Sequence, residues 1–285
     1  MRKIYNVNLT WPRLIIFAII MGVYTATVAM VPSLLNTSFH DISVSFEVWI
    51  FIGIFIIMNS KSAKDSALKC FIFFLISQPL VYILQDIINH SNLLFLYYRN
   101  WIGWTIFCIP MGYIGYYMKK DKIWGLAILT PMLLFTGLMY GSYLSSALYM
   151  FPYHILTALF CIFALLFYPL NIFKNKTNKK IGLIISVIIL VGTTLLCFVS
   201  PNVYSTDILS NDGDYKFDNT YKAYLEDSKY GDLSIKCDSD GFCLIHAEFK
   251  KGGKTKLIIE SPEGEKKVYK LDISYTKFDR EEVKQ

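Results

Sequence analysis

Three ionisable residues of this chain stand inside long apolar stretches: Glu47, Asp86 and His154. An ionisable side chain is costly in a hydrocarbon environment, so each of them is a candidate functional residue. Carboxylates and imidazoles are also the groups that most often transfer protons in catalysis. Proton transfer and charge pairing are therefore the two kinds of chemistry that these residues could carry out.

One of the three, Asp86, belongs to a larger polar pattern. Gln78, Tyr82, Gln85 and Asp86 recur at the spacing of a single helix face, which predicts a polar stripe that faces other helices. Arg99 follows in the next connector. We therefore predict a polar pocket at the outer ends of the helices, formed by Glu47, Gln78, Gln85, Asp86, Arg99 and His154.

A simpler structural interpretation applies to the same residues. An acid one or two helical turns from the membrane surface can reach water or pair with Arg99. Gln78 and Gln85 can hydrogen-bond between helices, which contributes under about 1 kcal/mol each. Scattered polar residues of this kind usually join helices, and the structural interpretation is strongest for His154.

The elements that must position these residues are hydrophobic helices. Only 18% of the residues are charged, against about 25% in soluble domains. Residues 1–200 hold 14 Lys and Arg against 5 Asp and Glu, whereas residues 201–285 hold 14 against 17. The net positive charge is thus no signature of nucleic-acid binding. The chain divides into a membrane region with basic connectors and a mildly acidic, water-soluble region.

Uncharged stretches of about 20 residues, the length that crosses a bilayer, recur along residues 1–200. We predict an α-helical, polytopic membrane domain of seven spans. The polar segment 141–146 is expected to divide the long uncharged stretch between Lys122 and Lys174. The predicted spans lie near residues 14–35, 42–60, 70–88, 100–118, 123–140, 150–173 and 181–199.

The basic connectors predict the orientation. Lys and Arg gather before span one and in the connectors after spans two, four and six, while the opposite connectors hold only Arg99. The positive-inside bias then predicts a cytoplasmic N-terminus, an extracytoplasmic C-terminal domain and a location in the plasma membrane. Residues 1–29 also resemble a cleaved signal peptide, but their apolar stretch is long for one, so we expect a retained helix.

The C-terminal region changes to the period-two pattern of β-strands. We predict a polar linker over residues 201–231, a segment that can include a short helix. A small antiparallel meander of four strands follows over residues 232–276, and residues 277–285 form a charged tail. Four strands make a marginal core, so the domain should need a covalent link or a partner.

Two of the six cysteines supply such a link. Cys237 and Cys243 are the only cysteines of the C-terminal region and flank a predicted turn on the oxidising side of the membrane. We predict a disulfide between them, for which direct strand pairing requires a five-residue loop. The other cysteines fall within spans, where they are expected to pack as small apolar residues.

The sequence also excludes several functions. It has no phosphate-binding glycine loop, no HExxH motif and no cluster of Cys and His, so we predict no ATPase, no zinc protease, no bound metal and no cofactor. Span seven holds no Lys, which excludes a retinal protein. Besides the lipid bilayer, the expected partner is a membrane or extracytoplasmic protein rather than nucleic acid.

Three functions remain open. The first is a non-enzymatic binding or assembly component at the outer face. The second is a membrane enzyme acting on a lipid-linked substrate, in which Glu47 or Asp86 is the base and Arg99 holds a phosphate or carboxylate. The third is a small permease, because Pro79, Pro110 and Pro131 fall near the midpoints of three consecutive spans.

Overall fold

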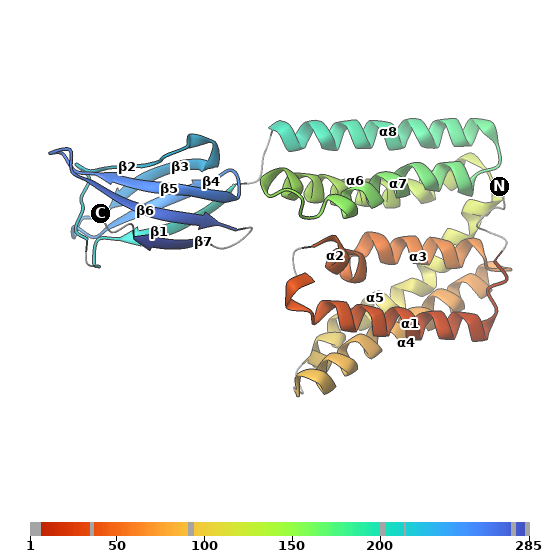
Figure 1. Cartoon of the computed structure of the whole chain (residues 1–285). Helices are drawn as coiled ribbons and strands as arrows, with labels where there is room; N and C mark the ends of the chain where they lie inside the picture. The colour runs from red at the N-terminus through yellow and green to blue at the C-terminus, as the bar shows by residue number, and fades with distance from the viewer. Residues whose placement is uncertain are drawn as a thin grey trace. The chain divides into compact units, whose positions relative to one another are not determined.

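The computed structural model describes residues 7–34, 37–90, 94–199, 203–213, 215–274 and 278–282. The chain forms two compact units. The helical unit comprises Met1–Tyr143 and His154–Leu195, and the β unit comprises Leu144–Tyr153 and Leu196–Gln285. In Figure 1 the helices run from red to cyan along the chain, and the strands follow in blue. Each unit is described below by itself.

Helices account for most of residues 11–199. Their bounds are α1 (Trp11–Ala29), η2 (Pro32–Leu34), α2 (Ser38–Val44), α3 (Phe46–Met58), α4 (Ala63–Asn89), α5 (Leu94–Gly115), η3 (Tyr116–Lys120), α6 (Ile123–Tyr149), α7 (Ile155–Ile172) and α8 (Lys176–Val199). Within the described residues, six helical segments are long and apolar enough to cross a membrane, with α2 and α3 counted together. The predicted span 100–118 lies in α5 and η3 and is not among the six. The count of seven spans therefore stays a prediction.

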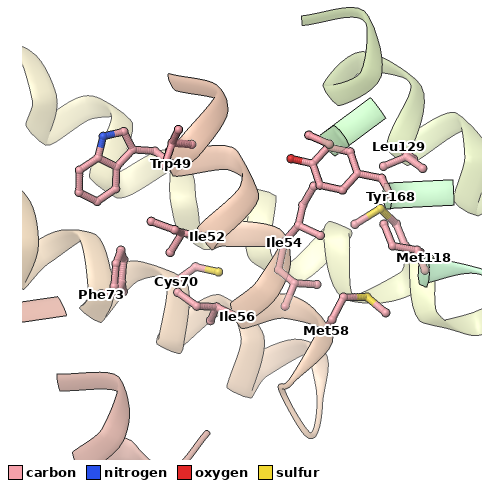
Figure 2. Close-up of a cluster of buried hydrophobic side chains, with 14 of the residues drawn as sticks. Trp49, Ile52, Ile54, Ile56, Met58, Cys70, Phe73, Met118, Leu129 and Tyr168 are labelled. Atoms are coloured by element: carbon pink, nitrogen blue, oxygen red, sulfur yellow. The ribbon is translucent and has the colours of Figure 1, made fainter. Parts of the chain in front are cut away.

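The second of these segments, α2 with α3, lies at the centre of the helical unit. Of its apolar window 65% is buried, against 17% for α8. Trp49 and Phe73 lie on one side of α3, whereas Ile54 points to the other side, toward Tyr168 (Figure 2). Because neighbouring helices cover it, this segment can hold polar residues that a lipid-facing helix could not.

Glycines let α4 approach its two neighbours closely. A Cβ atom at Gly22 of α1 would lie 2.9 Å from the backbone oxygen of Ser77, and one at Gly112 of α5 would lie 3.0 Å from the Cα atom of Ala67. Small residues at such positions allow membrane helices to pack backbone to backbone. The approach also lets the Ser66 hydroxyl donate a hydrogen bond of 2.8 Å to the Gly112 carbonyl.

One predicted helix boundary is wrong. The segment 141–146 does not divide the long uncharged stretch, since α6 continues through it to Tyr149. Glycine and serine are tolerated within hydrophobic helices because their backbone hydrogen bonds remain intact. The break falls at residues 150–154 instead, where Pro152 cannot continue the helix and His154 adopts the left-handed conformation with φ of 61°.

In the described residues, the β unit has seven strands in two antiparallel sheets. One sheet has the order β1-β4-β3 and the other β2-β5-β6-β7. The strands are β1 (Tyr204–Ser210), β2 (Lys222–Leu225), β3 (Gly231–Cys237), β4 (Cys243–Phe249), β5 (Gly253–Glu260), β6 (Lys266–Ile273) and β7 (Phe278–Glu282). The prediction of a single meander of four strands is therefore wrong, because it gives too few strands and one sheet instead of two.

The linker and the tail predicted around the meander contain strands. β1 and β2 lie within residues 201–231, which also hold the short 3-10 helix η4 (Ser228–Tyr230), and β7 lies within residues 277–285. β1 carries only one fully buried side chain, Ile208, and β2 has only four residues. Neither gives a strong period-two pattern, because alternation needs about four to eight residues with one apolar face.

The two sheets enclose their own hydrophobic core. Its largest fully buried members are Phe249, Ile245 and Leu257, and Tyr149 from the end of α6 is buried with them. The backbone amide of Gly252 donates a hydrogen bond of 2.9 Å to the Tyr149 carbonyl. Residues 144–153 thus belong to the core and backbone pairing of the β unit.

The predicted disulfide is present. Cys237 pairs directly with Cys243 in the β3–β4 register, and their Cα atoms are 4.0 Å apart. The connecting loop has the five residues 238–242 that direct pairing requires. Cys70, Cys108, Cys161 and Cys197 are free, and three of them are buried.

Candidate functional site

A buried cluster of polar side chains surrounds Asp41 in the helical unit. One carboxylate oxygen of Asp41, Oδ2, lies 2.7 Å from Nδ1 of His154 and accepts a hydrogen bond of 2.8 Å from the Thr157 hydroxyl. All three residues are at most 7% exposed. Burial strengthens these contacts, because they have no competition from water.

Two helices and the turn before α7 bring this cluster together. Asp41 lies in α2, and His154 directly precedes α7, which carries Thr157. The hydroxyl of Ser38 at the start of α2 accepts a hydrogen bond of 3.2 Å from the backbone amide of Thr157. The amide lies in the first turn of α7, where no intrahelical acceptor is available to it. α2 is therefore fixed against the beginning of α7.

Glu47 lies close to this cluster on the other side of a break in the helix. Ser45 separates α2 from α3 with an extended backbone, and Glu47 falls in the first turn of α3. Its side chain is fully buried, yet neither carboxylate oxygen has a hydrogen-bond partner. The hydroxyls of Ser45 and Tyr143 and the carboxylate of Asp41 are the groups that interact with it at longer range.

Tyr143 contacts His154 through its ring and interacts with Glu47 through its hydroxyl. Its ring centroid is 5.9 Å from that of His154, while its hydroxyl interacts with Glu47. Cys161 and Tyr168 of α7 also interact with Glu47. Side chains from α2, α3, α6 and α7 thus form one buried polar cluster, which we call the Asp41–Glu47 cluster. Its members are Ser38, Asp41, Ser45, Glu47, Tyr143, His154, Thr157, Cys161 and Tyr168.

The six residues of the predicted pocket lie in different places. Glu47 and His154 are both in the Asp41–Glu47 cluster. Gln78 is buried on α4 and lines an apolar cavity, whereas Gln85 and Asp86 are half-buried near the end of α4 and Arg99 is exposed on α5. The contacts described for the Asp41–Glu47 cluster come from α2, α3, α6 and α7, and neither α4 nor α5 supplies one.

Sequence reasoning missed Asp41, whose carboxylate contacts both His154 and Thr157 in the cluster. The predicted second span begins at residue 42, which leaves Asp41 in a connector, where an acid is unremarkable. A signal was present, because residues 37–60 hold two acids and His40 but no Lys or Arg. Two acids without a basic neighbour in one apolar segment indicate that other elements must supply their partners.

An apolar cavity of about 440 Å³ lies between α3, α4, α5 and α6. One face of α3 lines it with Phe46, Trp49 and Ile50, and Gln78 is among its few polar groups. Trp101 and Trp104 of α5 and Pro131 of α6 lie on its other walls. The volume lies within the usual range of ligand pockets, about 300–1,000 Å³. Its lining suits a hydrocarbon group.

The β unit presents a second candidate site, the loop at residues 238–242. Asp238 Oδ1 accepts backbone hydrogen bonds from Asp240 at 3.0 Å and from Phe242 at 2.9 Å. Asn211 binds the loop from the side: its amide nitrogen donates to the Gly241 carbonyl, and its oxygen accepts from the Cys243 amide. With the disulfide, these contacts hold the loop in one conformation. The Phe242 side chain at its end is 40% exposed.

Two exposed carboxylates of the β unit have altered acidity. Hydrogen bonds from the side chain and backbone of Thr220 lower the pKa of Asp218. Lys229 likewise lowers the pKa of Asp227, through hydrogen bonds from its ammonium group and its backbone amide. Both carboxylates therefore favour their charged form in the folded chain.

Among the described residues, no group of three or more His, Cys, Asp and Glu side chains is arranged to hold a metal ion. A comparison with family models, with characterised proteins and with solved structures finds no match to this chain. The two sites must therefore be interpreted from their own geometry.

Proposed function

We propose that this chain is a multi-pass plasma-membrane protein that binds a partner at its extracytoplasmic face without catalysing a reaction. In this proposal the β unit lies outside and the 238–242 loop makes the principal contact. The observation that carries it is the exposed side chain of Phe242 on a loop closed by a disulfide and by four hydrogen bonds.

Rigidity and an exposed aromatic side chain both favour binding. A loop that is already ordered loses little conformational entropy when a partner binds it. Aromatic side chains are frequent among the residues that contribute most to protein–protein affinity. An exposed phenylalanine at the end of a hairpin contributes little to the core of its own domain. Its position therefore favours a contact with another molecule.

Two independent features support the extracytoplasmic location. The basic residues gather in the connectors that would face the cytoplasm, which leaves residues 200–285 on the other side. Disulfides persist in oxidising compartments and are rare in the cytosol. The bond between Cys237 and Cys243 therefore supports the same side of the membrane as the charge distribution.

Photo-crosslinking in intact cells tests the proposal. A photoreactive phenylalanine analogue replaces Phe242 in one variant and Lys251 in another. Both positions are exposed, and they lie beyond opposite ends of β4, so they form a matched pair. We expect one discrete cross-linked protein from position 242 and none from position 251. Equal cross-linking from both positions, or none from position 242, contradicts the proposal.

One observation favours the second candidate, a membrane enzyme. The short contact between Asp41 and His154 resembles the carboxylate–imidazole pair that orients a general base. If that pair is catalytic, His154→Gln should change the lipid composition of producing cells relative to the unmodified chain, and Phe242→Ala should not. Asp86 and Arg99, the other predicted catalytic residues, lie on helices that supply no described contact to the pair. We do not propose a permease, since the cavity beside Gln78 and Pro131 is apolar.

A further inference from the structure

Glu47 is a fully buried carboxylate without a hydrogen-bond partner. An ionised carboxylate in such a place is costly unless an opposite charge compensates it. Lys69 is the only buried Lys or Arg among the described residues, and it already pairs with Asp65 at 2.9 Å. Among the described residues, no other buried Lys or Arg is therefore available to neutralise Glu47.

Asp41 has a partner of its own in His154, whose Nδ1 atom lies 2.7 Å from Asp41 Oδ2. The titratable groups that interact with Glu47 from the packed elements are Asp41 of α2, Tyr143 of α6, and Cys161 and Tyr168 of α7. None of them is cationic, so an ionised Glu47 would find no positive charge among these groups.

Two hydroxyl groups near Glu47 also lack a hydrogen-bond partner. The hydroxyls of Ser45 and Tyr168 are buried and, like both oxygens of Glu47, have no hydrogen-bond partner. Ser45 also marks the interruption between α2 and α3 in a candidate span. Interrupted membrane helices are places where transport proteins bind Na⁺ or protons. The other carboxylate of the cluster, Asp41, already contacts His154 and Thr157 through Oδ2, which leaves Glu47 as the single acid of the site and favours a monovalent cation.

We propose that Glu47 is the carboxylate of a binding site for one small monovalent cation, either Na⁺ or a proton. The cation supplies the positive charge that no side chain provides, and Ser45 and Tyr143 supply further oxygens. The site lies in the helical unit and does not depend on the binding role proposed for the β unit. A failure of one proposal therefore leaves the other intact.

Thermal unfolding of the purified full-length protein in detergent tests the site. All five tryptophans lie between residues 11 and 124, so tryptophan fluorescence reports on the helical unit alone. Melting is measured in NaCl and in N-methyl-D-glucamine chloride at equal ionic strength, across a range of pH. The variants are Glu47→Gln and, as a matched control, Asp86→Asn, which changes a half-buried acid of another helix.

The two cations give different results. If Na⁺ binds, each tenfold rise in NaCl above half-saturation raises the melting temperature by about 3–5 °C, and the effect weakens as protons compete at low pH. If a proton binds, Na⁺ has no effect and the melting temperature falls as pH rises. In either case Glu47→Gln abolishes the response and Asp86→Asn retains it. A response that Glu47→Gln retains, or no response to Na⁺ or pH in the unmodified chain, overturns the proposal.

A second variant covers the case in which Glu47→Gln does not fold. Glu47→Asp keeps a carboxylate, and infrared difference spectra between the two salts and between two pH values detect a carboxyl group that gains or loses a cation. We expect a carboxyl band in the unmodified chain that shifts in frequency in Glu47→Asp. An identical band in both proteins, or none in either, contradicts the assignment to Glu47.

Discussion

At the scale of single residues, the described part of the chain contains two Asp–His pairs of nearly equal length in opposite environments. Asp41 and His154 are 2.7 Å apart and buried, whereas Asp207 and His246 are 2.8 Å apart and the Asp207 side chain is 53% exposed. Removing one member of a buried charged pair leaves the other without compensation, while water replaces a lost partner at the surface.

We therefore predict different costs for the same substitution. Asp41→Ala should lower the free energy of unfolding of the helical unit by about 3–5 kcal/mol, measured by tryptophan fluorescence. Asp207→Ala should lower that of the β unit by at most about 1 kcal/mol. Fluorine NMR of a fluorotyrosine placed only at the buried Tyr269 follows the β unit. Equal losses in the two variants would show that Asp41 is not a buried structural partner.

Exposed carboxylates make the β unit sensitive to acid. The pKa of Asp218 and that of Asp227 are lowered in the folded chain. A lowered folded-state pKa contributes stability above the unfolded pKa of about 3.9, and this stability is lost as pH falls through the folded value. The β unit should therefore melt at lower temperature as pH falls below about 4.

Asp227→Asn should remove part of this pH dependence of the melting temperature. The fluorine signal of the fluorotyrosine at position 269 measures the melting of the β unit. The contribution is small because solvent reaches both carboxylates and screens their interactions. A pH profile below 4 that is identical in the variant and in the unmodified chain would contradict a role of Asp227 in acid stability.

The sequence predicts those site residues whose polarity differs from that of their neighbours in the chain. Glu47 and His154 can be identified because each interrupts an apolar stretch, and the structure brings both to one cluster. Asp41 lies at the edge of a span, where its burial depends on α7 packing over it. A one-dimensional pattern carries no information about such packing.

At the scale of elements, β3 depends on a glycine at its first residue. Gly231 has φ of 150° and ψ of −170°, a conformation that is essentially restricted to glycine, and a Cβ atom there would clash with the backbone oxygen of Glu248 in β4. Gly213 provides the control, since its φ is ordinary and no atom lies close to its Cβ position.

Gly231→Ala should therefore cost at least about 1–3 kcal/mol in stability of the β unit. Gly213→Ala should stay within about 0.5 kcal/mol of the unmodified chain. Hydrogen exchange of the β4 backbone amides measures the difference, because local opening of the β3–β4 pair exposes them. If both variants exchange as slowly as the unmodified chain, β3 is not paired with β4 as described.

Elements differ in how far the sequence predicts them. Long apolar helices are predicted as elements, since length and composition decide them, but several of their ends are displaced by more than one helical turn. The predicted boundary between α6 and α7 is wrong because Gly141 and Ser142 are residue types typical of turns. A hydrophobic helix nevertheless accommodates both. β1 and β2 are too short or too polar for their periodicity to appear before their partner strands are known.

At the scale of the whole molecule, the chain divides into two units whose compositions suit different solvents. Within the described residues, the helical unit has six segments long and apolar enough to cross a bilayer, and the β unit has a separate core and a disulfide. We propose that the basic connectors of the helical unit lie on the cytoplasmic side of the membrane and that the β unit lies on the other side. The proposed binding role of Phe242 requires this sidedness, whereas the cation site at Glu47 does not.

Labelling of introduced cysteines in intact cells tests this sidedness most directly. A membrane-impermeant maleimide is applied to Glu263→Cys, in the β5–β6 turn of the β unit, and to Ser62→Cys, before α4; both positions are exposed. The unmodified chain gives the background from its four free cysteines. We predict that position 263 reacts in intact cells and that position 62 reacts only after permeabilisation. Reaction at position 62 in intact cells, with position 263 protected, would contradict the account.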